Sequence, residues 1–570
     1  MALYLEAHQA IYAVAGLLLA LVLFSAFRTP VIRRNGVPLR KPPNTLPLAG
    51  NGILFLQARQ KLFAWFVKCQ RQFGYETFQV AVPTLPPGIV INDPRNLDFI
   101  FKNEGSLISK GSFVKGMLWD LFGHGIVNAD GDVWRTQRKA GLSFLNTANI
   151  RVLTDIALPH YLDSTLAHLQ KQAAASSQQD KTTAIDLQAV FHELTSCIMG
   201  RMAYNMEMHA DDEFTMAFDY ASGATTERFQ NPLWFITEAI TGSADLHKSL
   251  AIVKAFGRRI VSTAVADRKA QHGGSPDSIG SSRQPSLSAS HSSSTAESKI
   301  NEVSGSLIQS LLDAISDQDI VADAALNYLS AGRDTVAQGL TWTFYMLMQN
   351  PQIVDKIRQE VQRVLFAGAG RTDANNRSGH SLDFARLTPA AMPYTMAVFY
   401  EGLRLFPPIP FEIKQVEADH LILPDGTELE RGSLVIWCSW ALNRSRETWG
   451  DDADVFRPER WLTVAPLPMS GDATVTASAA AAAGNNTPPY RLVSRSASEF
   501  PVFHGGPRTC LGKKMAESMA VQTMAAVAWF FDLELAEPGA ERVTKTSLTL
   551  PMEGGLPCFV KARPGLGLVA

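Results

Sequence analysis

The pattern of apolar and polar positions along the chain is mainly helical. Over residues 320–349, apolar side chains recur every three or four positions, which predicts one helix about 45 Å long. A second helical pattern begins after Gly512. Short β-branched stretches at 89–91 and 434–437 predict strands. We therefore expect a mainly α fold with a smaller β region.

The N-terminus carries an apolar run of membrane length. Residues 10–27 contain no charge and span about 27 Å as a helix. A cleaved signal peptide is the alternative, but it requires positive charge before the run, where this chain has Glu6. Basic residues instead follow at 28–50, which predicts that this side stays cytosolic. We expect a short lumenal segment at 1–9, a single-pass transmembrane signal anchor in the endoplasmic reticulum membrane, and a basic, proline-rich hinge.

The rest of the chain, residues 51–570, shows no boundary between domains. Three polar segments interrupt it, and the first, 271–298, has eleven serines in 28 residues and no aromatic side chain. Such composition cannot bury enough apolar surface to fold alone. The others are 368–381 and 467–489. We interpret all three as surface insertions in one catalytic domain.

Composition excludes several classes of protein. Among the 570 residues, Lys and Arg total 52 and Asp and Glu total 54, so the net charge is −2. This balance argues against a nucleic-acid-binding protein. The five cysteines are widely spread and form no CxxC pair, which argues against a disulfide framework and a zinc site.

One cysteine lies in an unusual setting, the run Phe-His-Gly-Gly-Pro-Arg-Thr-Cys-Leu-Gly over 503–512. Its glycines and proline predict a tight loop. Cys510 then precedes the start of a helix, where the helix dipole and the loop amides favour a thiolate, and Arg508 adds positive charge. We expect the other four cysteines to be ordinary buried side chains.

This run resembles the haem-binding loop of the cytochrome P450 family at Phe503, Gly506, Arg508, Cys510 and Gly512. The resemblance implies the cytochrome P450 fold and a bound haem b (iron protoporphyrin IX). It makes Cys510 the axial ligand of the iron, and the other four residues become cofactor-binding.

Two further segments resemble the same family. Glu401 and Arg404 lie at i and i+3 on one predicted helix face, a spacing that is also common on solvated helices. The helix is followed by two prolines and later by the run Phe-Arg-Pro-Glu-Arg-Trp over 456–461. The resemblance implies that Glu401, Arg404 and Arg460 form a buried structural charge triad.

In the middle of the long helix, Gly332 allows a flat ligand to approach, and Thr335 is expected to bond back to the backbone and open the helix locally. Without the resemblance, Asp334 would be interpreted as a solvated charge on the helix surface. The resemblance instead makes Asp334 and Thr335 the catalytic acid–alcohol pair that delivers protons during oxygen activation. Val336 departs from the family, which often has Thr or Ser there.

The resemblance also assigns haem-propionate contacts, one of them to Arg508 of the loop. Trp134 and Arg138 are i, i+4 neighbours in a segment that looks like the family's propionate-binding helix. Lys414 stands where many members have arginine, so we expect a contact there too.

Within the family, eight positions have a spacing similar to eukaryotic, and in particular fungal, long-chain fatty acid and alkane hydroxylases: Phe214, Ala217, Phe218, Asp219, Arg228, Phe229, Pro232 and Trp234. The alternative is that most of these side chains are simply core. The segments 125–139 and 340–347 look like the same group.

The implied function is a membrane-anchored haem-thiolate monooxygenase that hydroxylates a hydrophobic small molecule with O2. No Gly-rich nucleotide fingerprint follows a strand, so we expect electrons from a membrane-bound NADPH–cytochrome reductase. Lys513 and Lys514 either dock this partner or are solvated helix charges. Two rivals stay open: a reductase-independent isomerase or dehydratase of lipid peroxides, and a non-catalytic haem sensor or carrier. The Asp334–Thr335 pair argues against both.

Overall fold

The computed structural model describes scattered positions between 12 and 24 and residues 30–564, apart from 48, 83–84, 179–183, 232, 242, 273–295, 367–381 and 465–488. Half of the expected anchor and most of the three expected insertions therefore lie outside the described residues. In the part of the chain that the structure describes, no helix combines the length and apolar character needed to cross a membrane.

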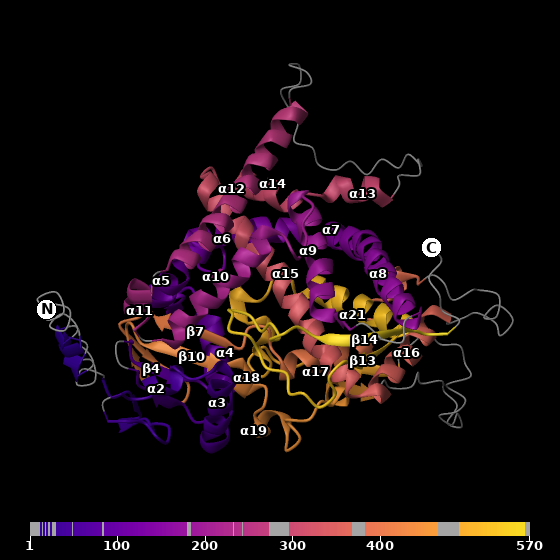
Figure 1. Cartoon of the computed structure of the whole chain (residues 1–570). Coiled ribbons are helices and arrows are strands. Elements are labelled where there is room, and N and C mark those ends of the chain that lie inside the picture. The colour runs from indigo at the N-terminus through magenta and orange to yellow at the C-terminus, as the bar shows by residue number, and fades with distance from the viewer. Residues whose placement is uncertain are drawn as a thin grey trace, which may run out of the picture.

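The fold is mainly helical, as expected. In Figure 1 helices fill the upper part and the middle of the molecule, and most of the strands lie in its lower half. In chain order the named α-helices are α2 (Gly52–Phe55), α3 (Arg59–Phe73), α4 (Pro94–Asn103), α5 (Gly111–Phe122), α6 (Gly131–Phe144), α7 (Thr147–Val152), α8 (Leu158–Gln178), α9 (Leu187–Tyr204), α10 (Glu213–Gln230), α11 (Trp234–Thr241), α12 (Ala244–His272), α13 (Ala296–Val303), α14 (Ser306–Ala314), α15 (Gln318–Met348), α16 (Pro351–Phe366), α17 (Pro393–Leu405), α18 (Ser439–Leu442), α19 (Arg446–Trp449) and α21 (Lys513–Phe530).

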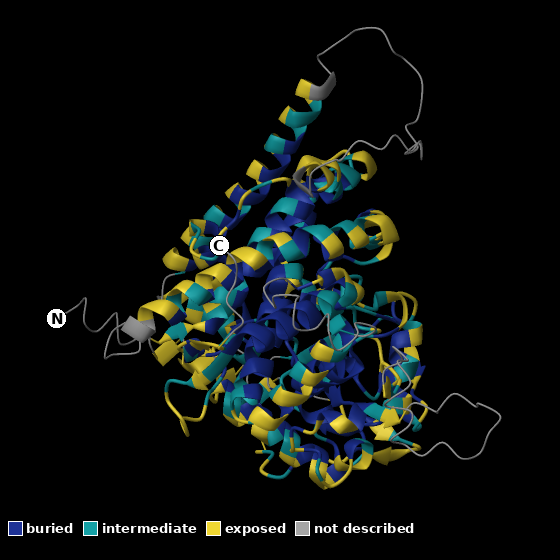
Figure 2. Ribbon diagram, turned by 90° about the vertical axis from the view of Figure 1, so that its right-hand side faces the viewer, coloured by how far each residue is buried: buried dark blue, intermediate teal, exposed yellow. Residues whose placement is uncertain are grey.

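The long helix predicted over 320–349 is α15, and it runs through the middle of the molecule in contact with α9, α12, α17 and α21. Most of its side chains are buried on all sides. Figure 2 shows the same organisation, because buried residues fill the centre and exposed ones cover the outside. The helix predicted after Gly512 is α21, which begins at Lys513.

Within the described residues, the strands form four small sheets. They are β1 (Arg33–Arg34), β2 (Val37–Pro38), β3 (Phe78–Val80), β4 (Gly88–Val90), β5 (Ile108–Ser109), β6 (Ile185–Asp186), β7 (Phe411–Val416), β8 (His420–Ile422), β9 (Thr427–Glu430), β10 (Leu434–Cys438), β11 (Leu462–Val464), β12 (Tyr490–Leu492), β13 (Phe531–Leu535) and β14 (Pro557–Ala562). The largest sheet has the order β3-β4-β10-β7-β5. Both predicted strands belong to it as β4 and β10, which pair in parallel with Ile89 opposite Val435.

The segment predicted as a hinge, 28–50, is partly built into the fold. Its strands β1 and β2 form a hairpin, and β1 pairs with β9 so that Arg33 lies opposite Glu428. Ile32 and Leu39 are buried beside them. The described part of this segment therefore belongs to the folded body, which the sequence pattern did not indicate because each strand is only two residues long.

Candidate active site

One cavity of about 510 Å³ lies between the cysteine-bearing loop and α15. Its lining is mostly apolar. The sequence assigned seven cofactor-binding and two catalytic residues that now line this one cavity: Phe503, Arg508, Cys510, Gly512, Trp134, Arg138, Lys414, Asp334 and Thr335. Gly506 is the predicted cofactor residue that does not line it.

Gly506 instead shapes the loop. Its φ of +60° is a left-handed conformation that side chains disfavour, and an added Cβ would lie 2.1 Å from the backbone oxygen of Phe101. A Cβ on Gly505 would lie 2.3 Å from the Phe101 ring. The loop therefore packs directly on α4, and the backbone amide of Cys510 closes it by donating to the oxygen of Phe503 at 2.8 Å.

The thiol of Cys510 is open to the cavity, while the other four cysteines are buried or half-buried. Burial raises the pKa of Cys510, and it outweighs the opposing effects of the Gly512 amide and of Arg138 and Lys513. The Gly512 amide therefore favours the thiolate, as the sequence indicated, although burial is the larger effect in this structure. A metal ion deprotonates a coordinating thiol outright. Binding to iron would therefore convert the thiol of Cys510 to the thiolate.

Two arginines and a tryptophan form the charged end of the cavity. The Arg508 guanidinium lies 4.5 Å from the Trp134 ring centroid, donates to the oxygen of Ala129 at 2.9 Å and pairs with Asp130. Arg138 lies 5.5 Å from the same ring and donates to the oxygen of Thr509 at 2.9 Å. Within the described ranges no carboxylate pairs with Arg138, so this cation has capacity for an anionic ligand.

Lys414 lines the cavity too, but its ammonium group is already paired. It lies 2.6 Å from Oε1 of Glu104 and 3.8 Å from Glu412. Glu104 also lies 3.4 Å from Nε2 of His504 and 3.5 Å from Nε of Arg508. Burial alone would raise the pKa of Glu104, but Lys414, followed by His504 and Arg508, brings it below its ordinary value.

Glu104 is a functional-site residue that the sequence did not single out. A lone glutamate at the end of α4 carries no motif, and its partner Lys414 is 310 positions away. His504 was likewise only a spacer in the loop motif, although it lines the cavity and its Nε2 is buried without a hydrogen-bond partner.

Asp334 is buried in an ion-pair network, so it is no solvated helix charge. Its Oδ1 accepts from Nε of Arg333 at 2.5 Å, and Arg333 reaches Asp219 on α10 at 3.1 Å. Nδ1 of His192 lies 3.9 Å from Asp334, and burial lowers the pKa of His192 to about 4. Burial raises the pKa of Asp219 to about 6. Arg333 therefore links Asp334, the predicted acid, to α10. The sequence did not single out Arg333, and its position next to Asp334 was the only sign of this role.

Thr335 lines the cavity one residue further along α15. Its hydroxyl donates to the backbone oxygen of Ala331 at 2.7 Å, which is the expected back-bond. The helix nevertheless runs unbroken from Gln318 to Met348, so the expected local opening is wrong. A back-bond of this kind is compatible with an intact helix.

The structure brings the three residues of the predicted charge triad together. Both oxygens of Glu401 accept from Arg404 at 2.8 Å, and Oε1 also accepts from Nε of Arg460 at 2.9 Å. The indole of Trp461 donates to Oε2 at 2.9 Å. Arg404 further reaches the backbone oxygen of Ala453 at 2.6 Å. These side chains are buried, and they join α17 to the segment 453–461.

The segment similar to the hydroxylases is divided between cavity and core. Phe218 and Phe229 line the cavity, whereas Phe214 stacks on Phe256 in the core, with 4.2 Å between the two ring centroids. Arg228 is buried and pairs with Glu238. Pro232 lies outside the described residues.

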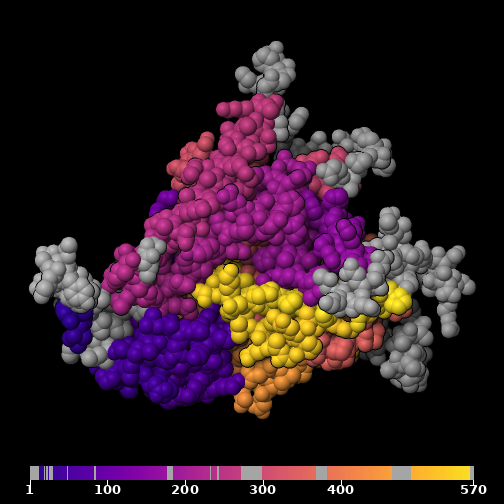
Figure 3. Space-filling view, viewed as in Figure 1, coloured from indigo at the N-terminus to yellow at the C-terminus, as the bar shows by residue number. Residues whose placement is uncertain are grey.

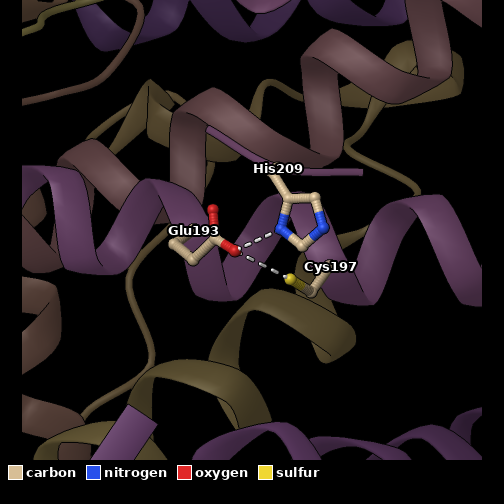
Figure 4. Close-up of side chains that lie close together, drawn as sticks. All are labelled: Glu193, Cys197 and His209. Atoms are coloured by element: carbon tan, nitrogen blue, oxygen red, sulfur yellow. Dashed lines mark hydrogen bonds and ion pairs between the residues drawn. The ribbon is translucent and has the colours of Figure 1, made fainter. Parts of the chain in front are cut away.

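A separate group of side chains lies away from the cavity, where Glu193 and Cys197 on α9 meet His209 (Figure 4). Nδ1 of His209 lies 2.7 Å from Oε1 of Glu193, and the thiol of Cys197 lies 3.4 Å from it. The other carboxylate oxygen accepts from the amide of Ala210 at 2.7 Å. These bonds explain why the three side chains lie together: they join α9 to the loop that follows it.

A thiol that faces a long helix across an apolar cavity is the arrangement that the family resemblance implies for a haem whose iron is held by cysteine. The residues present fit this cofactor, because Cys510 is open to the cavity, Arg138 has no carboxylate partner within the described ranges, and most of the remaining lining is apolar. We expect Cys510 to hold the iron, and Arg138, Trp134 and Arg508 to lie at the propionates. Bound haem supplies the redox chemistry that activates O2.

The chain belongs to the cytochrome P450 family, whose profile matches residues 40–559. It is 30% identical to cytochrome P450 86B1 of Arabidopsis thaliana over 476 residues, which cover 81% of this chain and 75% of the relative. It is 27% identical to cytochrome P450 704B1 of the same plant, over 93% of this chain and 97% of the relative. Cytochrome P450 monooxygenase cyp1 of Mycosarcoma maydis is 27% identical, over 92% of this chain and 75% of the relative. The protein is accordingly a haem-thiolate monooxygenase.

Proposed function

We propose that this monooxygenase hydroxylates a C–H bond of a fatty-acid-like or alkane-like chain, using O2 and electrons from a membrane-bound NADPH–cytochrome reductase. The observation that carries the substrate class is the cavity itself, because apolar side chains line it from α3 to Cys510 and Thr335: Leu62, Phe66, Val114, Leu118, Phe122, Phe218, Phe229, Leu403 and Phe411. A cavity of this kind favours an apolar ligand. The resemblance of the segment 214–234 to long-chain hydroxylases supports the same class.

The decisive experiment is turnover of the purified protein with a fatty acid and an alkane in the presence of NADPH and reductase. Hydroxylated product that depends on both additions supports the proposal. Activity that needs no reductase and consumes a lipid hydroperoxide would instead support the isomerase or dehydratase. Haem binding without either reaction would support the sensor.

We further propose that the catalytic body lies on the cytosolic face of the endoplasmic reticulum membrane. The apolar run at 10–27 and the basic residues after it support this location. Lys513 and Lys514, at the start of α21, are available for an acidic reductase surface: Lys514 is exposed, and Lys513 is half-buried at 3.8 Å from Glu517.

We assign Asp334 and Thr335 the delivery of protons to the reacting oxygen. Replacing Thr335 with alanine is expected to uncouple the reaction, so that NADPH and O2 are still consumed while hydroxylated product falls about 100-fold. The reason is that the variant keeps the cavity and the thiol but lacks the hydroxyl group beside them. The ratio of product formed to NADPH consumed measures this effect.

Thr341→Ala is the matched control for this prediction. Thr341 lies on the same helix and makes the same back-bond, to the oxygen of Ala337 at 2.8 Å, but it does not line the cavity. Its replacement is expected to leave the coupling ratio unchanged. Unchanged coupling in Thr335→Ala, or equal uncoupling in both variants, would show that the Thr335 hydroxyl has no special part in proton delivery.

A further inference from the structure

Arg59, the first residue of α3, is a buried guanidinium group that lines the cavity. Only 6% of the residue is exposed. Its Nη1 donates to the backbone oxygen of Ser547 and lies 3.4 Å from that of Lys545, and its carbon Cζ lies 5.3 Å from the centroid of the Phe63 ring. Figure 3 shows the C-terminal segment in yellow lying against the N-terminal part in indigo, the two parts that Arg59 joins.

The charge of Arg59 has no counter-ion. In the described part of the chain, no carboxylate lies within ion-pair distance of it, whereas the buried Arg333 and Arg404 have Asp334 and Glu401. Burial lowers the pKa of Arg59 to about 9, so it remains a cation at neutral pH. A buried cation without an anion is costly, because backbone oxygens replace only part of its hydration.

The surroundings of Arg59 add a second preference for an anion. The start of α3 has no acidic residue in its first turn and no side-chain cap, so the positive end of the helix dipole is also uncompensated. The hydrogen bonds found for the guanidinium involve only Nη1, which leaves Nε and Nη2 for a ligand. A carboxylate matches this donor arrangement, because it accepts two parallel N–H bonds.

We propose that Arg59 binds the carboxylate of the substrate, which makes fatty acids rather than alkanes the preferred class. This inference rests on the proposed function, because it concerns the same cavity. The hydrocarbon chain would leave Arg59 between the apolar side chains of Leu62, Phe66 and Phe411. Because one cavity is lined by both Arg59 and Cys510, fixing one end of the chain also limits which carbons reach the thiol-bearing end.

The test is a binding titration followed by the substrate-induced shift of the Soret band, which needs no turnover. The ligands are palmitic acid, methyl palmitate and hexadecane, which share their chain length and differ in the group at one end. The wild-type protein is expected to bind the acid about 10- to 100-fold more tightly than the ester, the size of effect given by one charge-assisted bidentate contact.

Arg59→Met is expected to lose this preference for the acid and to keep its affinity for the ester and for hexadecane. Lys61→Met is the matched control, because Lys61 lies on the same helix with the same charge but is exposed and does not line the cavity. This control is expected to bind all three ligands as the wild type does. Arg59→Lys keeps the charge but lacks the planar guanidinium group that donates two parallel bonds. Its preference for the acid is expected to lie between those of the wild type and Arg59→Met.

The outcomes separate the two proposals. A wild-type protein that binds ester and acid equally, or an Arg59→Met variant that keeps the preference, overturns the role of Arg59 while the monooxygenase with a lipid-like substrate stands. If no ligand shifts the Soret band of the wild-type protein, the proposed substrate class fails as well. If Arg59→Met does not fold, Arg59→Lys decides the question: an unchanged preference for the acid overturns the role of Arg59, and a reduced preference supports it.

Discussion

Replacing Cys510 with serine is expected to abolish the thiolate-type Soret shift of the reduced, carbon-monoxide-bound protein, together with its monooxygenase activity. Cys510 is the cysteine whose thiol opens into the cavity, and the loop that carries it packs on α4 through Gly505 and Gly506. A serine fits this space but offers no thiolate to the iron. The absorption spectrum and the product yield measure the two effects separately.

Cys197→Ser is the control for this substitution. Cys197 is half-buried on α9, and burial, followed by Glu193, raises its pKa to about 12, so it is an unreactive thiol outside the cavity. The control is expected to keep the wild-type spectrum and activity. A thiolate-type spectrum that survives in Cys510→Ser would mean that another residue holds the iron.

Replacing Glu401 with glutamine is expected to lower the free energy of unfolding by about 3–5 kcal/mol, the cost of breaking a buried ion pair from one side. The Glu401 carboxylate accepts from Arg404, Arg460 and the Trp461 indole, and all are buried. Glutamine has the same size but is uncharged, so the buried Arg404 loses its anion and Arg460 keeps only Asp452 at 3.2 Å. The shift of the denaturant unfolding curve measures the loss.

Arg457→Met provides the comparison, because it breaks a neighbouring ion pair at the surface. The Arg457 side chain lies 2.5 Å from Asp452, and both are more than a third exposed. The expected loss is about 0–1 kcal/mol. Equal losses in the two variants would contradict the view that burial gives the Glu401 network its importance.

The sequence predicted the parts of the fold whose signals are local and repeated. The period of α15, the prolines that end α17 and the glycines before Cys510 each act within a few residues, and the structure places all three elements as expected. The sequence also predicted most of the residues assigned to the cofactor and to catalysis that line the cavity, because the family motifs identify them by their spacing along the chain.

What the sequence could not predict depends on contacts between distant positions. Glu104 acquires its role only where folding brings Lys414 and Arg508 to it. Arg59 looks like a surface charge at the start of a helix until its burial and its lack of a carboxylate partner are known. Burial also opposes the expected lowering of the Cys510 pKa by the loop amide, and the sequence did not indicate this, because the desolvation of a charge has no signature in composition or spacing.

The strand pairing has a consequence for the order of events during synthesis. β4 pairs with β10, β1 with β9 and β6 with β14, so each of these N-terminal strands waits for a partner more than three hundred residues further along the chain. Until that partner has been made, the strand edge that will bind it is unpaired and open to other chains. Because translation proceeds at about 5–20 residues per second, the early strands stay unpaired for tens of seconds. The pairing therefore predicts that the newly made N-terminal part exposes strand edges until the chain has been synthesised as far as β9, β10 and β14.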